Sequence, residues 1–347
     1  MMDASLTLTE RFEQKLQALQ FGPVDRLLVF RPVACGLGGQ LSGRIMTLAM
    51  ALALGRKAVF LSPADPPYGQ TFAELNDPVD LTGLDDAPVV AITEDQSARI
   101  VVHDPRLMPP FDAAAKKALL DKMSARLGMA VTSRTLAEGL AFNWLKILPD
   151  VAAWCEAQRA RLGVDADTLG VHFRRGDKAV ETAFVPASVI NARIAEIHAV
   201  WPFAKLFLAS DSPAAPQEIV CPPGVELIFD TEEQRFNNAN HKMLMERPDL
   251  VEQETLVAFK NIHLLARCGG VVGQDNAHFA TIAAASILAR GTAPARVALI
   301  SGRIAEENSA ALAALFRMKK LVRAIGRRLL PGMTASARMR RAEQRRA

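Results

Sequence analysis

The sequence predicts an α/β fold in which two Rossmann-like domains face each other across a cleft. Short apolar runs alternate with segments of helical apolar spacing, first over residues 26–63 and again over residues 168–300. Such alternation is typical of parallel sheets built from βαβ units. The chain has 347 residues, of which 50% are hydrophobic, so it is long enough for about two domains with buried cores. We expect these domains at residues 1–165 and 166–305, followed by a helical basic tail at residues 306–347.

The first domain begins with a helix predicted over residues 7–20 and a short buried strand in RLLVFRPV. A glycine-rich turn, a long apolar helix and the strand KAVFLSP complete one βαβ unit. Residues 64–110 are rich in Pro, Asp and Gly and form an irregular part of the domain, with strand-like pieces in PVVAIT and RIVVHD. Apolar positions at helical spacing recur over residues 112–161, so the domain is expected to end in helices.

The second domain repeats the alternation with more strands. Strands are predicted at residues 168–173, 205–209, 225–229, 270–273 and 296–300, and helices at residues 186–199, 250–267 and 277–289. Ligands of open parallel sheets bind at the carboxyl ends of the strands. The polar residues that directly follow these strands are therefore the candidate site.

Composition and spacing exclude several classes of protein. The cysteines lack C-x-x-C spacing, which argues against a structural zinc site and for reduced thiols in a cytosolic protein. No His-Glu-x-x-His pattern or nucleophile elbow occurs, which excludes the common zinc and serine hydrolases. The N-terminus has no basic stretch leading into an apolar run, so we expect no secretion signal. The run IMTLAMALALG is shorter than the ~18 residues of a membrane span and predicts a buried helix.

A basic tail accounts for the net charge of +4. Residues 317–347 contain eleven Lys or Arg and one acid, Glu343, which leaves 30 bases and 36 acids upstream. In FRMKKLVRAIGRRLLPG the apolar residues share one helical face and the basic residues fill the rest. Such a helix either lies on an anionic membrane surface or packs its apolar face on the second domain, and both alternatives stay open.

Glycines and polar residues at strand ends are the candidate binding residues. Gly36 and Gly38 precede the first apolar helix, where they form either an anion-binding loop or a tight turn without a ligand. No Gly-Lys-Ser/Thr follows, so this is not a P-loop. Ser210-Asp211-Ser212 and Gln274-Asp275-Asn276 follow later strands, as site residues or as helix caps.

The stretch HFRRGDK carries the most information. His172, Arg174, Arg175 and Lys178 follow a strand that is apolar throughout. Unpaired buried charges cost several kcal/mol, so the two arginines require an anionic partner. Guanidinium geometry suits a diphosphate; the alternative is an internal ion pair with Asp177 or with the aspartate at position 211.

Five segments in this order resemble the fucosyltransferase superfamily. HFRRGDKAVETAF resembles its His-x-Arg-Arg signature, and the Lys and Glu of this segment resemble most the α-1,6-fucosyltransferases. CGLGGQL with LSPADPPYGQTFAELNDPV is similar to the glycine loop and the segment after it, and FNWLKILPDVAAW to the helix before the signature. LFLASD and NIHLLARCGGVVGQDNAHFA resemble the second and third motifs. The similarity extends over residues 30–290.

The resemblance implies a GT-B glycosyltransferase that moves fucose from GDP-fucose to a hydroxyl of a glycan acceptor, with the α-1,6 type favoured. Such enzymes invert the anomeric carbon and need no metal or other cofactor. Lys178, Glu181 and Arg174 match the catalytic residues, with Glu181 as the candidate general base. The implied donor-binding residues are Arg174, Arg175, His172, Asp211, Asn261, Asp275, Asn276, Gly36 and Gly38.

Other functions stay open from the sequence. Asn261 stands where the family has an Asp that contacts guanine, which keeps a transferase for another GDP-sugar open beside a protein O-fucosyltransferase. A non-catalytic nucleotide-sugar or nucleic-acid binding protein is the alternative from another class, but no aromatic stacking platform supports a nucleic-acid partner. We expect neither the membrane anchor nor the SH3-like domain of the animal enzymes of this superfamily. We therefore expect a bacterial-type cytoplasmic enzyme that acts on a glycan or lipid-linked saccharide, with peripheral contact at the inner face of the membrane through the tail.

Overall fold

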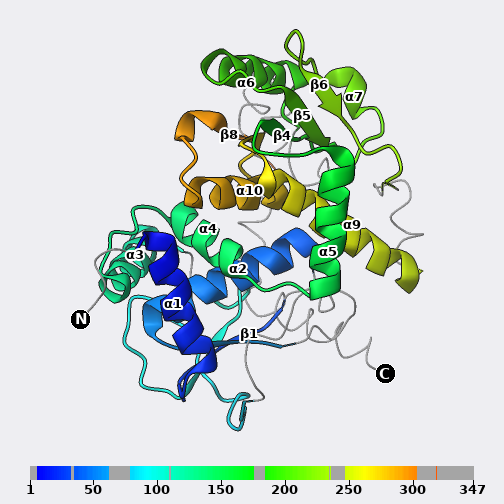
Figure 1. Ribbon diagram of the computed structural model, residues 1–347. Helices are drawn as coiled ribbons and strands as arrows, with labels where there is room; N and C mark the ends of the chain where they lie inside the picture. Colours follow the sequence, from blue (N-terminus) through cyan, green and yellow to red (C-terminus); the bar gives the residue numbers. More distant parts are fainter. Residues whose placement is uncertain are drawn as a thin grey trace.

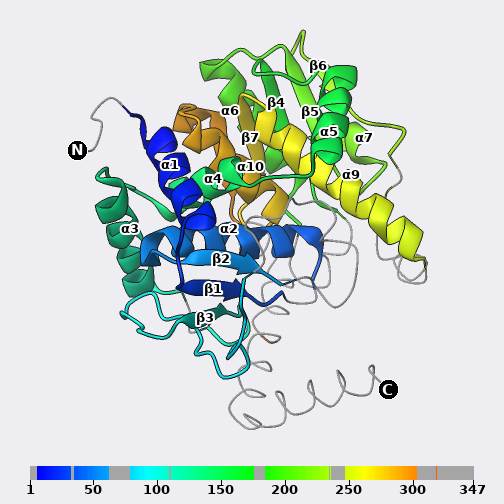
Figure 2. The ribbon, with the colours of Figure 1, turned by 60° about the horizontal axis from the view of Figure 1, so that its bottom comes forward.

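The first sheet has three parallel strands in the order β2-β1-β3 (Figure 2). The strands are β1 (Leu27–Phe30), β2 (Lys57–Phe60) and β3 (Ile100–His103). Every residue of β1 and β3 is buried, as expected for parallel strands covered on both faces. The computed structural model describes residues 6–32, 35–61, 79–108, 111–175, 184–233, 235, 247–302 and 318.

Several helices of the first domain begin or end at residues that supply caps. The helices are α1 (Leu8–Phe21), α2 (Leu37–Leu54), α3 (Ala113–Leu127), α4 (Arg134–Trp144) and α5 (Pro149–Leu162). Thr7 and Glu10 form a capping box at the start of α1. Gly55 ends α2 in the left-handed conformation (φ 64°), which glycine adopts without strain.

The second sheet has five parallel strands in the order β6-β5-β4-β7-β8. The strands are β4 (Thr168–His172), β5 (Lys205–Ala209), β6 (Glu226–Ile228), β7 (Gly270–Gln274) and β8 (Val297–Ile300). The helices are α6 (Ala187–Val200), α7 (Ala215–Glu218), α9 (Pro248–Arg267) and α10 (His278–Ala289), and the short 3-10 helix η3 spans Pro294–Arg296. Buried β4 is the central strand because β5 and β7 pair with its two sides.

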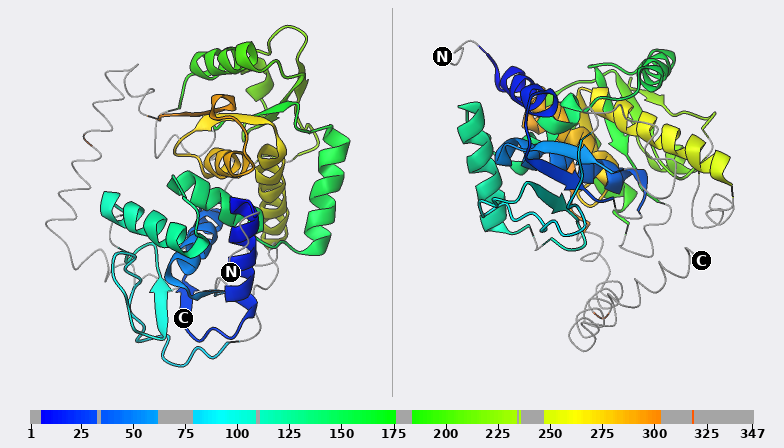
Figure 3. Two further views of the ribbon diagram at one scale, coloured as in Figure 1. Left: turned by 60° about the vertical axis from the view of Figure 1, so that its left-hand side comes forward. Right: turned by 90° about the horizontal axis from the view of Figure 1, so that it is seen from below.

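The two sheets belong to separate lobes that meet along α4 and α10, as Figures 1 and 3 show. A Cβ atom on Gly139 of α4 would lie 2.0 Å from the carbonyl oxygen of Ala285 in α10, so only glycine allows this approach. Beside it, the Ser286 hydroxyl donates to Asn143 Oδ1 at 2.6 Å. Two Rossmann-like domains in contact confirm the predicted α/β fold of GT-B type.

Two further expectations can be compared with the structure. PVVAIT forms only a single bridge, Val89 to Val102, and not a strand, so this prediction was wrong. The Gln96 side chain takes the hydrogen-bonding positions that a neighbouring strand would use. Its Oε1 accepts a hydrogen bond from Ala91 N at 3.0 Å, and its Nε2 donates one to Val89 O at 3.0 Å. The predicted burial of α2 is confirmed: the helix is long and apolar enough to cross a membrane, but 83% of its apolar window is buried inside the protein.

Candidate functional site

The second sheet has a topological switch point at the carboxyl ends of β4 and β7, and we refer to this region as the crevice. The chain runs from β4 outward through β5 and β6 on one side, and through β7 and β8 on the other. Loops that follow β4 and β7 therefore leave in opposite directions, and ligands of open α/β sheets bind at such a point. His172 ends β4, Arg174 follows it closely and Asp275 directly follows β7, as the sequence predicts.

His172 is a buried, neutral histidine in this crevice. Its ring stacks on that of Phe279, the second residue of α10, with the ring centres 5.2 Å apart. Burial, and secondly the charge of Arg174, lowers the pKa of His172 to about 3. Among the described residues, nothing hydrogen-bonds its Nδ1 atom. A buried nitrogen of this kind is suited to a polar group of a ligand.

The adjacent arginines have different surroundings. Arg174 forms an ion pair with Asp211, its Nε lying 3.4 Å from Asp211 Oδ2, and 23% of its side chain is exposed. Arg175 instead lies over the ring of Phe173 at 3.6 Å and contacts Glu218 and the carbonyl oxygen of Val185. Burial lowers the pKa of Arg175, although the charge of Glu218 opposes this shift. Phe173, Glu218 and Val185 therefore hold the Arg175 guanidinium in the protein, and its predicted contact with the donor stays a prediction.

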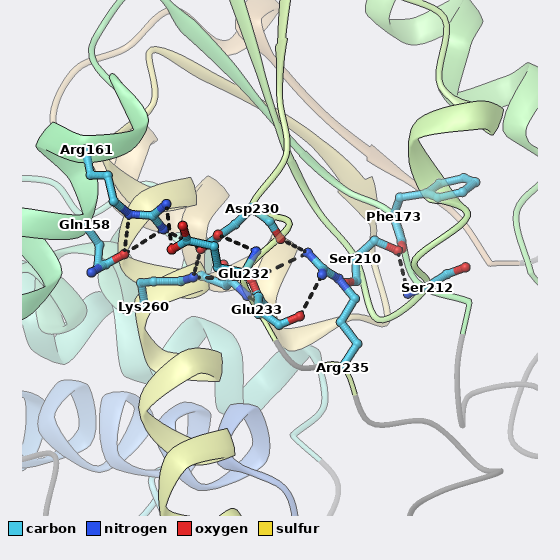
Figure 4. A network of polar contacts seen from close by, with 11 residues as sticks. Gln158, Arg161, Phe173, Ser210, Ser212, Asp230, Glu232, Glu233, Arg235 and Lys260 are labelled. Carbon is cyan, nitrogen blue, oxygen red and sulfur yellow. Dashed lines mark hydrogen bonds and ion pairs between the residues drawn. The ribbon is translucent and has the colours of Figure 1, made fainter.

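A buried ionic network holds the loop after β6 against the strands (Figure 4). Asp230 accepts hydrogen bonds from Lys260 Nζ at 2.6 Å and Arg161 Nη2 at 2.9 Å. Arg235 donates to the carbonyl oxygen of Ser210 at 3.0 Å and to that of Asp230 at 2.6 Å. Burial alone would raise the pKa of Asp230, but its hydrogen bonds with Lys260 and Arg161 and their charges outweigh burial and lower this pKa. The network ties α5, α9 and the end of β5 into one rigid wall.

Asn261 projects from α9 into this wall. Its Nδ2 donates to Glu233 Oε1 at 2.7 Å, and this bond fixes which end of the amide carries the oxygen. The Oδ1 atom is buried and has no hydrogen-bond partner among the described residues. Asn261 therefore offers a neutral acceptor to a group that donates a hydrogen.

Glu254 is a candidate site residue that the sequence interpretation missed. It lies seven residues before Asn261, on the same face of α9. Burial, and next the charge of Glu233, raises the pKa of Glu254 to about 8, while the charge of Arg174 acts in the opposite direction. Glu254 is therefore mainly protonated at neutral pH. The sequence shows that Glu254 and Asn261 are seven residues apart. It does not show that this face of the helix packs against the strand ends.

Two helix N-termini meet at the crevice. A Cβ atom on Gly38, in the first turn of α2, would lie 2.8 Å from the Cβ of His278, the first residue of α10. No described side chain caps either helix, so the positive ends of both helix dipoles face this region. Gly36 directly precedes α2, and a Cβ atom added to it would meet no atom within 4 Å. Asp275 and Asn276 are exposed, and Asp275 Oδ1 accepts a hydrogen bond from Gly302 N at 3.2 Å.

A cavity of about 510 Å³ lies on the side of the first domain. Phe30 and His103, which end β1 and β3, line it. Arg106 and Arg134 of the first domain and His278 of the second domain also contribute to the lining. The chain runs from β1 to β2 on one side while β3 lies on the other, so this cavity also lies at a topological switch point. His103 is buried and its Nδ1 lies 2.7 Å from Thr47 Oγ1; burial lowers the pKa of His103 to about 4.

The structure thus brings part of the predicted site together. His172, Arg174 and Asp211 lie at adjoining strand ends, with Asn261 on the neighbouring helix α9. The catalytic candidates Lys178 and Glu181 lie outside the described residues. No cluster of three or more His, Cys, Asp or Glu side chains suited to a metal ion occurs in the described part of the chain. The predicted metal independence stays a prediction.

Comparison with known proteins gives only structural likenesses. No family model and no curated protein matches the sequence. The α-1,6-fucosyltransferase NodZ co-crystallised with GDP is 18% identical, over 78% of this chain and 93% of its own, with a TM-score of 0.45. A FUT1 mutant of Arabidopsis thaliana in complex with GDP is 10% identical over 80% and 72%, with a TM-score of 0.48. POFUT1 in complex with GDP-fucose is 12% identical over 80% and 98%, with a TM-score of 0.42. Because the TM-scores are below 0.5, the function is inferred from the residues of this chain.

Proposed function

We propose that this protein is an inverting, metal-independent glycosyltransferase that moves fucose from GDP-fucose to a hydroxyl of a glycan, with an α-1,6 linkage favoured. One observation carries the proposal. The end of β4, with His172 and Arg174, and the uncapped starts of α2 and α10 converge on one crevice. A guanidinium and two positive helix ends are the groups that bind a diphosphate.

The same groups serve the chemistry of transfer. When the bond between C1 of fucose and the β-phosphate oxygen breaks, its electron pair stays on GDP and negative charge grows on the phosphate. Fixed positive groups placed at that oxygen stabilise the transition state, the task that a divalent metal performs in many transferases. Arg174 is held in place for this by its ion pair with Asp211.

The acceptor is proposed to bind in the cavity of about 510 Å³ across the crevice. An acceptor hydroxyl attacks C1 from the side opposite the phosphate and its proton passes to a carboxylate, for which Glu181 is the sequence candidate. Arg106, Arg134 and His278 line the cavity and offer hydrogen-bond donors to sugar hydroxyls. This arrangement forms the new glycosidic bond with inversion at C1.

A transferase for a different GDP-sugar is the second candidate, because the groups described above suit the nucleotide and the diphosphate and do not identify the sugar. Asn261 bears on the base and not on the sugar. Guanine presents two adjacent N–H groups that a carboxylate would accept with charge-assisted bonds. Asn261 presents a single neutral oxygen instead. A non-catalytic nucleotide-sugar binder is the third candidate.

Calorimetry with GDP, UDP and ADP tests the donor class. We expect GDP to bind in the micromolar range and more tightly than either control nucleotide. The protein is then incubated with GDP-fucose, GDP-mannose or GDP-glucose and no acceptor other than water. We expect slow hydrolysis, measured as released GDP, only for the sugar that the enzyme transfers. Equal binding of the three nucleotides would contradict the proposal, and GDP binding with no release from any sugar would favour the non-catalytic alternative.

Glu254 gives the site a predicted pH dependence. Because its pKa is raised to about 8, ionisation between pH 7 and pH 9 adds a negative charge near Arg174 and should lower GDP affinity roughly tenfold. In Glu254→Gln the charge cannot form, so GDP affinity should stay level over this range. UDP affinity in the same buffers is the control for the titration of the nucleotide.

A second readout of the same variant does not depend on GDP. The raised pKa means that folded protein binds more protons than unfolded protein between about pH 4.5 and pH 8. The free energy of unfolding of the parent should therefore fall relative to that of Glu254→Gln as pH rises through this window. Parallel stability curves for the two proteins would show that Glu254 has an ordinary pKa.

The location of the protein is also a proposal. We propose a cytoplasmic enzyme held peripherally at the inner face of the membrane by its basic tail, near a lipid-linked acceptor. The support is the amphipathic pattern of residues 317–347, which lie outside the described residues apart from the exposed Met318.

A further inference from the structure

A second hollow lies at the opposite edge of the first sheet from the crevice. It has a volume of about 780 Å³ and is lined by the residues that precede β1, β2 and β3, by the end of α2 and by α3. Arg26 comes directly before β1, Arg56 directly before β2, and Gln96 before β3. The hollow is therefore formed at the amino ends of the strands, whereas the proposed transfer site is formed at their carboxyl ends.

Arg56 forms the floor of this hollow as a buried cation. Only 1% of the residue is exposed. Its Nη1 donates to the carbonyl oxygens of Leu27, Ala98 and Arg99 at 3.2, 2.9 and 3.2 Å, and its Nη2 to that of Gln96 at 2.7 Å. Carbonyl oxygens satisfy the N–H groups, but among the described residues no carboxylate pairs with the charge.

Three further cations surround Arg56. Arg26 donates to the same Gln96 carbonyl, and Arg126 of α3 donates from Nε to the carbonyl oxygen of Ala53 at 3.1 Å. Lys122, one turn earlier on α3, pairs with Asp95 at 2.7 Å, and Asp95 is the only acid among the described residues that line the hollow. Four cations therefore face one carboxylate.

The electrostatics of the hollow disfavour positive charge unless an anion is present. Burial, followed by repulsion from Arg26, lowers the pKa of Arg56 to about 10. The attraction of a bound anion for the guanidinium would offset both effects. Arg126 contacts Ala53 at the end of α2, Arg26 donates to the Gln96 carbonyl oxygen and Lys122 pairs with Asp95, but these contacts still leave four cations beside one carboxylate.

We propose that this hollow binds the phosphate or diphosphate group of a ligand other than the sugar donor. Several guanidinium groups around one concave surface match the oxygens of a phosphate, which they bind with charge-assisted hydrogen bonds. The volume exceeds that of a single phosphate and leaves room for the group that the phosphate is attached to. A soluble phosphorylated sugar and the headgroup of an anionic lipid present the same chemistry here.

Titration of the full-length protein with inorganic pyrophosphate, followed by calorimetry, tests the site. The double variant Arg26→Ala/Arg126→Ala removes two exposed side chains and should lower affinity at least about tenfold. Lys117→Ala is the matched control, because Lys117 lies on the same helix, pairs with Asp121 and does not line the hollow. Unfolding midpoints without ligand establish that each variant is folded, and the milder Arg26→Gln replaces the double variant if it is not.

A third protein separates this site from the transfer site. Arg174→Ala should still bind pyrophosphate in the hollow, whatever becomes of the proposed transferase activity. Binding that Arg174→Ala loses and Arg26→Ala/Arg126→Ala keeps would place pyrophosphate in the crevice and overturn the proposal. The same holds if none of the proteins binds pyrophosphate.

Vesicles distinguish the two sources of phosphate. Co-sedimentation with vesicles of phosphatidic acid in phosphatidylcholine is compared between the parent and the double variant, both with the basic tail intact. A loss in the variant identifies a lipid headgroup as the ligand. Unchanged co-sedimentation together with weakened pyrophosphate binding identifies a soluble phosphorylated ligand.

Discussion

Replacing Arg174 with alanine is expected to lower the affinity for GDP by about a hundredfold and to abolish transfer, while the protein stays folded. A charge-assisted bond from a guanidinium to a phosphate in a partly buried site contributes about 3 kcal/mol, and its loss leaves the diphosphate facing Asp211 without compensation. Since 23% of the Arg174 side chain is exposed, truncation leaves no sealed cavity. Calorimetry with GDP and a urea unfolding curve measure the two effects separately.

Arg175→Ala is the control for this result. It removes the contact with the Phe173 ring and leaves Glu218 without its cation, so it should cost about 2 kcal/mol of unfolding free energy. We expect it to weaken GDP binding less than Arg174→Ala does. The reverse order would assign the phosphate contact to Arg175, and unchanged GDP binding in both variants would mean that the arginines serve the fold alone.

Gly139→Leu is expected to destabilise the protein by about 3 kcal/mol or more. The first atom of any side chain at this position would lie 2.0 Å from the Ala285 carbonyl oxygen and 2.8 Å from Ala289 Cβ, so α4 and α10 must move apart. Their separation also stretches the hydrogen bond between Ser286 and Asn143. The measurement is the midpoint of urea unfolding.

Gly36→Ala provides the comparison for the effect of glycine replacement itself. A Cβ atom on Gly36 meets no atom within 4 Å, so this variant should lose only the roughly 0.5–1 kcal/mol by which alanine is a poorer helix N-cap than glycine. If Gly139→Leu unfolds at the same urea concentration as the parent, the two helices are not packed in solution as they are in the structure.

The sequence predicts the strands well because each is a short apolar run followed by polar residues. This pattern places His172, Arg174 and Asp211 at the edge of the sheet before any coordinates are known. It does not separate Arg174 from Arg175, because the partner of Arg175, Glu218, lies 43 residues further along the chain. The raised pKa of Glu254 likewise depends on the burial that results from the packing of α9 on two strands. Contacts between distant segments therefore account for most of what the sequence leaves open.

The glycine contact between α4 and α10 also bears on how the two substrates are brought together. When two domains move relative to each other, only part of the population has the closed arrangement that binds a ligand. The apparent affinity for the first ligand is then lower than the affinity of the closed form. Here α4 and α10 meet closely at Gly139 and Ala285, so the spacing between the proposed diphosphate crevice and the opposite cavity is set during folding. In the proposed transferase, the orientation of one substrate towards the other is then set before either binds. The same fixed spacing should exclude acceptors that are thicker or thinner than the cavity allows.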